Sequence, residues 1–137
     1  MAITKQKGDT AEAYLAYTLK KQGFNVLIPW GEDVRYDLVS EKNGVFKRIQ
    51  VKSIKPKKGV LEVRFRSCNS HKVIHYSSKD VDIIAVYNEE GNKVYFIPLT
   101  DAGRKGYKLR LTPAKNNQKK FVTLSSKYES RFDLLEI

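Results

Sequence analysis

Three polar residues whose side chains suit phosphodiester hydrolysis lie in the first half of the sequence. Asp37 supplies a carboxylate, and Gln50 and Lys52 supply an amide oxygen and an ammonium group. In a strand, side chains two residues apart share a face, so Gln50 and Lys52 point the same way and Ile49 and Val51 point the other way. Oxygen ligands can hold Mg²⁺, which neutralises charge on a scissile phosphate and lowers the pKa of a bound water. The lysine can position that water or stabilise the pentavalent state.

A second acid is needed beside Asp37. Mg²⁺ is usually held by one or two protein carboxylates together with waters and substrate phosphate. Glu12, on the first predicted helix, is the obvious candidate. Its spacing also fits an exposed helix acid that the dipole at the helix N-terminus favours, and the residues alone leave both interpretations open.

A hairpin is predicted to carry Asp37 and the Gln50–Lys52 pair. Residues 35–39 are a short β-prone run, 42–44 (Lys-Asn-Gly) are a turn signal, and 45–52 alternate between apolar and polar residues. Pairing of the two strands can bring Asp37 onto the face that the pair occupies.

One helix is predicted before this hairpin. Thr4 or Asp9 could cap it, and it extends to about Gln22, where Gly23 ends it. Glu12 lies near its start, close to one buried stripe formed by Ala11, Tyr14, Leu15, Thr18 and Leu19.

Further strands are predicted at residues 24–28, 60–66, 82–87 and 93–99. The last two are continuously apolar, which is typical of a central position buried on both faces. The single tryptophan, Trp30, follows the first strand and is expected in the core, with stacking at the edge of the site as the alternative. Near the end of the chain, four apolar residues either close the core or form a subunit interface: Phe132, Leu134, Leu135 and Ile137.

Basic residues dominate two segments, around 53–79 and 101–120. The chain has 26 Lys and Arg against 15 Asp and Glu, a formal net charge of +11, which makes a polyanion the expected partner. We expect double-stranded DNA, with phosphates held on either side of the cut. Residues 101–120 are predicted to form a flexible, DNA-contacting arm or loop. A solvated face is the alternative for the first segment, and a disordered solubilising loop is the alternative for the second. The residues assigned to DNA contact are Lys55, Lys57, Lys58, Arg64, Arg66, Lys72, Arg104, Lys105, Lys108 and Arg110; Arg64 and Arg66 are predicted to share a strand face and to reach guanines.

Length and composition limit the remaining possibilities. The 137 residues are expected to form one domain, 1–137, with a single core. No apolar run approaches the roughly 18 residues of a membrane span, and the N-terminus lacks the apolar core of a signal peptide. With one cysteine, Cys68, no internal disulfide can form, so an intracellular, cytoplasmic protein is expected. Cys68, His71 and His75 lack the paired spacing of a structural zinc site.

The order Glu12, Asp37, Gln50-Val51-Lys52 resembles the PD-(D/E)XK nuclease superfamily, which has a helix glutamate, a strand aspartate and an acid-x-lysine motif. Its context is similar to the small homing endonucleases of this type encoded in group I introns, over roughly residues 5 to 98. Tyr36 stands where the motif has proline. Gln50 replaces an acid, as it does in the intron-encoded subgroup. The quoted context is Lys7-Gly8-Asp9, Tyr36-Asp37-Leu38-Val39, Gln50-Val51-Lys52-Ser53, Ala85-Val86-Tyr87 and Val94-Tyr95-Phe96-Ile97-Pro98.

The resemblance implies an α/β (α+β-like) domain with a restriction-endonuclease-like core, in which an N-terminal helix packs on a mixed sheet of about five strands. It implies a Mg²⁺-dependent DNA endonuclease, in which Mn²⁺ substitutes for Mg²⁺. Asp37, Gln50 and Glu12 would bind the metal, and Lys52 would act at the attacking water or phosphate. One site cuts one strand, so double-strand cleavage implies a homo-oligomer, a dimer or tetramer. A Holliday-junction resolvase and a non-catalytic nucleic-acid-binding protein on the same scaffold are the alternatives.

Overall fold

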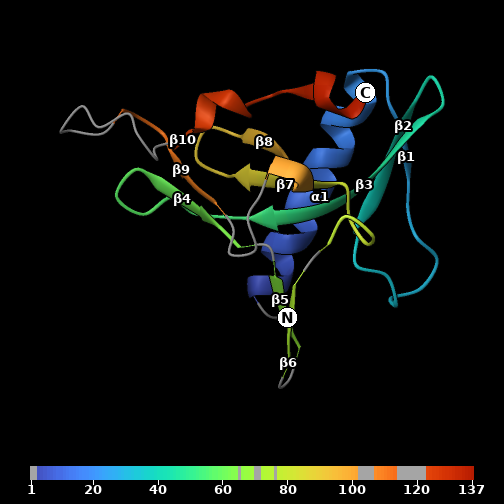
Figure 1. Cartoon of the computed structure of the whole chain (residues 1–137), viewed down its shortest axis with the longest axis horizontal. Helices are drawn as coiled ribbons and strands as arrows, with labels where there is room; N and C mark the ends of the chain where they lie inside the picture. Colours follow the sequence, from blue (N-terminus) through green and yellow to red (C-terminus); the bar gives the residue numbers. More distant parts are fainter. Residues whose placement is uncertain (1–2, 65, 70–71, 76, 102–106, 114–122) are drawn as a thin grey trace.

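The structure is a computed structural model that describes residues 3–64, 66–69, 72–75, 77–101, 107–113 and 123–137. As predicted, one N-terminal helix packs on a mixed five-stranded sheet (Figure 1). The sheet has the order β1-β2-β3-β7-β8, in which β3 and β7 are parallel and the other neighbours are antiparallel. Its elements are α1 (Ile3–Lys21), β1 (Asn25–Leu27), β2 (Leu38–Lys42), β3 (Val45–Ser53), β7 (Ile83–Asn88) and β8 (Lys93–Pro98).

The buried stripe of α1 fixes the helix on the sheet. Ala11, Leu15 and Leu19 recur every four residues, are fully buried, and pack in one core with residues of β2, β3, β7 and β8. The helix begins at Ile3, so Thr4 and Asp9 both lie inside it and neither is its N-cap. It ends as predicted near Gly23, whose φ of +89° suits a glycine that follows a helix C-terminus.

The β2–β3 hairpin has the predicted turn. Asn43 and Gly44 both have positive φ, 52° and 82°, which is the backbone of a two-residue hairpin turn. The strand β2 begins at Leu38, later than the predicted 35–39. The reason is that the Val51 N–H donates a hydrogen bond to the side chain of Asp37, and not to a backbone carbonyl of β2.

A second core lies on the other face of the five-stranded sheet. A three-stranded sheet of order β10-β9-β4 contributes Leu61, Val63 and Leu109, which pack against residues of β7 and β8. All six residues of β7 are buried, as predicted for a central strand. In contrast to the prediction, β8 is at the sheet edge; backbone hydrogen bonds to Tyr128 and Ser130 cover that edge. The additional strands are β4 (Val60–Val63), β9 (Tyr107–Arg110) and β10 (Thr123–Leu124).

The predicted strand 60–66 is interrupted. The strand β4 ends at Val63, and Arg66 begins a separate hairpin of β5 (Arg66–Asn69) and β6 (Lys72–His75). The prediction that Arg64 and Arg66 share a strand face is therefore wrong. Arg64 instead forms an ion pair with Glu62, with 3.5 Å between Nη2 and Oε1.

Three short 3₁₀ helices complete the described residues: η1 (Leu99–Asp101), η2 (Ser125–Lys127) and η3 (Phe132–Leu135). The last one closes the first core, because Leu135 is buried and the Phe132 ring lies 5.0 Å from that of Phe96, centroid to centroid. Ile137 remains exposed.

Trp30 is not in the core, contrary to the prediction. Its side chain is fully exposed, in the connection between β1 and β2. Residues of α1 and of the small sheet fill the two cores on the faces of the main sheet, and Trp30 belongs to neither core. Among the described residues, no helix is long and apolar enough to cross a membrane.

Candidate active site

Asp37 lies where the connection from β1 enters β2. Its backbone N–H donates to the Ile49 carbonyl at 2.8 Å, and its Oδ2 accepts a 2.8 Å hydrogen bond from the Val51 N–H. The two bonds hold the carboxyl group against the middle of β3. Burial raises the pKa of Asp37, although the Val51 hydrogen bond and the charge of Lys52 act in the opposite direction.

Glu12 reaches Asp37 from the helix. It follows the buried Ala11 on α1 and forms a hydrogen bond with the Asp37 side chain. Partial burial, then the negative charge of Asp37 and the hydrogen bond between the two, raise the pKa of Glu12 to about 7. At neutral pH the two acids therefore hold a proton between them in a large share of the molecules, which an exposed helix acid would not do.

Gln50 and Lys52 flank Val51, the residue whose N–H binds Asp37. Ile49 is fully buried and Val51 partly buried in the core beneath α1, which leaves Gln50 and Lys52 on the opposite face of β3, as predicted. The charge of Lys52 lowers the pKa of Asp37, so its ammonium group acts on the same site. The described interactions thus bring Glu12 and Lys52 to Asp37, whereas for Gln50 the structure gives its strand face alone.

A basic groove of about 590 Å³ lies beyond the end of β3. The strand β4 pairs with β9 so that Val60 faces Arg110 and Glu62 faces Lys108. Because side chains alternate, these four residues share the outer face of the small sheet while Leu61 and Leu109 point into the core. The full lining is Ile54, Lys55, Lys57, Lys58, Val60, Glu62, Arg64, Lys108 and Arg110.

The groove unites six of the ten predicted DNA contacts: Lys55, Lys57, Lys58, Arg64, Lys108 and Arg110. Arg66 and Lys72 lie in β5 and β6, but their side chains are outside the described part of the structure, and Arg104 and Lys105 lie outside the described residues. The predicted arm or loop at 101–120 is wrong at 107–110, which form β9 because they pair with β4.

The sequence matches the PD-(D/E)XK endonuclease family over residues 2–131. This chain belongs to that family. Among solved structures, the PD-(D/E)XK protein described here is similar to a bacterial homing endonuclease, I-Ssp6803I, with a TM-score of 0.72 and 29% sequence identity over 97% of this chain and 93% of that chain. A search of curated proteins found no match.

PD-(D/E)XK nucleases generally use divalent metals, and the donor set of this site fits one. Two carboxylates with raised pKa values are held together here, an arrangement that a bound cation would relieve. Among the described residues, no group of three or more His, Cys, Asp or Glu side chains could hold a metal. Carboxylate oxygens are ligands that hard divalent cations accept together with waters and substrate oxygens.

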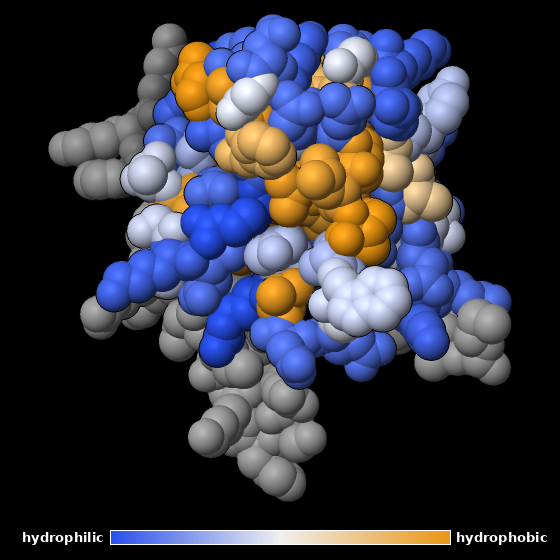
Figure 2. All heavy atoms as spheres, turned by 90° about the vertical axis from the view of Figure 1, so that its right-hand side faces the viewer, coloured by the Kyte–Doolittle hydropathy of each residue, from blue (hydrophilic) through white to orange (hydrophobic). Residues whose placement is uncertain are grey.

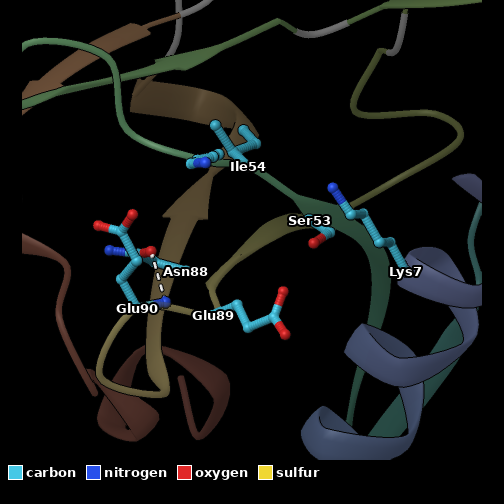
Figure 3. Close-up of a pocket in the computed structure, with 7 residues that line it drawn as sticks. Lys7, Ser53, Ile54, Asn88, Glu89 and Glu90 are labelled. Carbon is cyan, nitrogen blue, oxygen red and sulfur yellow. Dashed lines mark hydrogen bonds between the residues drawn. The ribbon is translucent and has the colours of Figure 1, made fainter. Parts of the chain in front are cut away.

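A smaller hollow of about 270 Å³ adjoins the PD-(D/E)XK motif (Figure 3). Ser53, directly after Lys52, lines it together with Lys7 from α1 and Glu89 from the turn after β7. Lys55 lines both this hollow and the basic groove, so the two are neighbours. Sequence reasoning did not assign Lys7 to the site; the Lys-Gly-Asp run quoted for the resemblance was the available signal.

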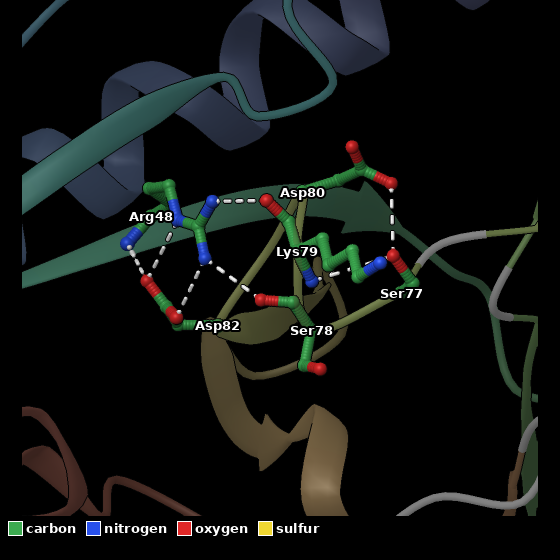
Figure 4. Close-up of polar contacts among 6 residues, drawn as sticks. All are labelled: Arg48, Ser77, Ser78, Lys79, Asp80 and Asp82. Atoms are coloured by element: carbon green, nitrogen blue, oxygen red, sulfur yellow. Dashed lines mark hydrogen bonds and ion pairs between the residues drawn. The ribbon is translucent and has the colours of Figure 1, made fainter.

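A second polar cluster anchors β3 to the start of β7 (Figure 4). Both Nε and Nη2 of Arg48 donate to the Asp82 carboxylate, at 3.1 and 3.0 Å. The Arg48 backbone N–H also donates to this carboxylate at 2.8 Å, and the Asp82 backbone N–H donates to the Arg48 carbonyl at 3.0 Å. Burial alone would raise the pKa of Asp82, but the hydrogen bonds from Arg48 outweigh it and hold the pKa below its ordinary value. The neighbouring Asp80 pairs with Arg35 at 3.8 Å, which ties this cluster to the residues just before Asp37.

Proposed function

We propose that this chain is a Mg²⁺-dependent DNA endonuclease, similar to a homing endonuclease, that hydrolyses phosphodiester bonds. The observation that carries the proposal is the hydrogen-bonded Glu12–Asp37 pair, with Lys52 acting on the same carboxylate. Membership of the PD-(D/E)XK endonuclease family and the likeness to a homing endonuclease support it.

Each residue of the site has a role in this proposal. Glu12, Asp37 and the amide oxygen of Gln50 would hold the cation, with Mn²⁺ able to substitute for Mg²⁺. When bound, a divalent ion neutralises charge on the scissile phosphate and lowers the pKa of a bound water. The Val51 N–H fixes Oδ2 of Asp37, so the carboxylate is oriented before substrate arrives. The ammonium group of Lys52 stabilises the negative charge that grows on the phosphate.

The basic groove would hold the DNA backbone beside the site. Six of its nine lining residues are Lys or Arg and one is an acid, an imbalance that attracts phosphate without reading sequence. The groove and the proposed site are close in sequence, because the groove residue Lys55 lies three residues after Lys52, just beyond the end of β3. One site cuts one strand, so cleavage of a duplex calls for two copies of the chain.

The test is cleavage of a supercoiled plasmid, a linear duplex and a four-way junction, each with Mg²⁺, Mn²⁺ or EDTA. Wild type is compared with Asp37→Asn and Lys52→Ala, and with Asp33→Asn as the matched control, since Asp33 is an exposed acid of the connection that precedes Asp37. The proposal expects metal-dependent cutting that both site variants lose and the control retains. Cutting that survives Asp37→Asn would contradict it, and a preference for the junction would reassign the substrate to that of a resolvase.

A non-catalytic nucleic-acid-binding protein is the second candidate, and Gln50 is the observation that favours it. An amide carries no charge, so the donor set has one negative charge fewer than the acid-x-lysine motif provides. Gln50→Glu distinguishes the two candidates. If the wild type cuts with Mg²⁺ or Mn²⁺, the endonuclease stands. If only the variant cuts, while the wild type binds DNA, the second candidate is correct.

A further inference from the structure

The hollow beside the active site is lined by acids as well as bases. It has a volume of about 270 Å³ and lies at the carboxyl end of β3, the strand that carries Lys52. Exposed apolar side chains gather instead on the side of the molecule that carries β1 (Figure 2). Apart from Ile54, the hollow is lined by polar or charged residues: Lys7, Ser53, Lys55, Asn88, Glu89 and Glu90. A polar or charged ligand therefore fits this hollow.

Strand pairing brings the turn after β7 to the hollow. The strands β3 and β7 are parallel, with Ser53 opposite Tyr87, so both strands end at the same edge of the sheet. Glu89 directly follows β7, and in Figure 3 its carboxylate projects toward the side of the hollow that Ser53 and Lys7 form. Glu89 thus faces the segment through which the chain leaves the active-site strand.

Hydrogen bonds fix the turn that carries Glu89. The Tyr87 hydroxyl donates to Oδ1 of Asn92 at 2.6 Å, and the Tyr14 hydroxyl donates to the Asn92 carbonyl at 3.0 Å. Tyr14 lies two residues after Glu12 on α1, so the turn is bound to the helix that supplies one acid of the active site. A contact made by this turn therefore has a defined position relative to the site.

The acid Glu89 needs a hydrogen-bond donor if DNA lies beside it. Lys55 lines both the hollow and the basic groove, so a duplex held in the groove as the proposed function requires would pass close to Glu89. Among the described residues, no ion pair joins Glu89 to Lys7 or Lys55. Phosphates repel a carboxylate, and the donors that a duplex offers are the amino groups of its bases.

Cytosine is the base that suits a single carboxylate. The turn joins two antiparallel strands, β7 and β8, and a two-stranded ribbon fits the major groove, about 12 Å wide, but not the minor groove of about 6 Å. In the major groove cytosine presents its N4 amino donor. Adenine presents the acceptor N7 beside its N6 amino group, and guanine and thymine present acceptors. A carboxylate that accepts a hydrogen bond there therefore favours cytosine.

We propose that Glu89 reads a cytosine of the substrate beside the cleavage site, and that Lys7 and Lys55 bind the phosphates next to this nucleotide. The inference rests on the proposed function, because it takes DNA as the substrate and names a base that the site selects. Glu89 contributes specificity and the two lysines contribute affinity, since phosphate contacts hold DNA without distinguishing its bases.

The first test selects bound duplexes from a random pool, once in EDTA and once in Ca²⁺, and sequences them. The full-length wild type is compared with Glu89→Ala and with Glu32→Ala as the matched control, since Glu32 is also exposed but does not line the hollow. We expect wild type and control to prefer cytosine at one position by about tenfold. Glu89→Ala should lose the preference at that position and keep it elsewhere.

The second test removes the amino group that Glu89 would bind. In a selected duplex the cytosine is replaced by 2-pyrimidinone, which lacks the N4 amino group. Wild type should lose about tenfold in affinity, whereas Glu89→Ala, which has no acceptor, should lose far less. Equal losses in the two proteins would overturn the proposal, as would a cytosine preference that Glu89→Ala keeps, or the absence of any cytosine preference in wild type.

Lys7→Ala separates affinity from specificity. It should weaken binding to all duplexes of the pool alike and leave the cytosine preference unchanged; a changed base preference would overturn the phosphate role of Lys7. Plasmid cleavage with Mg²⁺ is measured separately. A wild type that prefers cytosine but does not cut leaves this inference standing while the proposed function fails. A wild type that cuts without a cytosine preference leaves the proposed function standing and overturns the inference.

Discussion

The two carboxyl clusters along β3 differ in what accompanies the acid. At one, burial raises the pKa of Asp37, and its nearest acidic neighbour is Glu12, whose pKa rises to about 7. At the other, Asp82 is also partly buried, but Arg48 holds its pKa below the ordinary value. Burial raises the pKa of both acids, so the neighbouring group decides whether the net pKa shift is upward or downward.

The comparison separates a carboxylate whose neighbour is a second acid from a carboxylate that an arginine binds directly. Asp82 has its cation within the chain and serves to join β3 to β7. Asp37 has the weaker influence of Lys52 and a second acid, an arrangement that costs stability and is kept where chemistry needs it. We therefore expect the two clusters to respond in opposite ways to neutralisation.

The largest expected effect is on cleavage. Asp37→Asn should lower the rate of metal-dependent plasmid cutting by about a hundredfold or more, because it removes charge from the donor set. Asp82→Asn should leave the rate within a few fold, since this carboxylate belongs to the structural cluster. Cleavage time courses at saturating Mg²⁺ measure both. Equal losses in the two variants would show that the clusters act as one unit.

For the free energy of unfolding we expect the reverse order, with the larger effect from variants in the Arg48–Asp82 cluster. Arg48→Met removes the charge-assisted hydrogen bonds to Asp82 and should lower the free energy of unfolding by about 2 kcal/mol, as measured by urea denaturation. The double variant Arg48→Met/Asp82→Asn should lose less than the sum of the two single variants, since neither partner is then left without the other. Strict additivity would mean that the contacts between Arg48 and Asp82 contribute no coupling energy.

The raised pKa of Glu12 defines the direction in which folding stability changes with pH. Its pKa is raised from 4.5 to about 7, so the folded chain binds more protons than the unfolded chain between these values. The stability of metal-free protein should therefore fall as the pH rises through this window. Glu12→Gln should remove the fall and stabilise the protein at pH 8 by about 1 kcal/mol, a figure reduced for solvent screening of a partly exposed pair.

Thermal melts in EDTA between pH 5 and pH 8 test this expectation. Addition of Mg²⁺ at pH 8 should restore stability to wild type more than to Glu12→Gln, because the cation would bind the ionised pair. The window for Asp82 is separate, since its lowered pKa contributes stability that is lost only as the pH falls below about 4. A melting temperature of wild type that does not change between pH 5 and pH 8 would contradict the assignment at Glu12.

Local patterns predicted the residues around Asp37, but they did not predict contacts between distant segments. The Asn43–Gly44 turn and the alternation along β3 place Gln50 and Lys52 on one face, because both rules act over a few residues. The pairing of Arg48 with Asp82 joins positions 34 residues apart. No local period encodes such a contact, so the sequence left Asp82 either near the site or as a cap or turn residue.

The groove and the exposure of Trp30 also depend on contacts between distant segments, which local sequence patterns do not predict. The basic residues that line the groove were singled out by charge, but only the pairing of β4 with β9 places them on one surface. For the same reason, the interruption of the strand after Val63 could not be read from its alternating residues. Trp30 was expected in the core on its residue type alone. Its exposure depends on which elements cover the sheet, which is a property of the whole fold.

The smallest expected effect concerns single cations of the groove. Lys108→Ala removes one phosphate contact, so affinity for a non-specific duplex should fall a few fold and the slope of log K against log salt should become shallower by about one. Lys93→Ala is the matched control, since Lys93 pairs with Glu129 at 3.3 Å and does not line the groove. Fluorescence anisotropy titrations at several salt concentrations give both slopes. An equal change in the two variants would assign binding to net charge, whereas a change in Lys108→Ala alone places the phosphates in the groove beside Asp37.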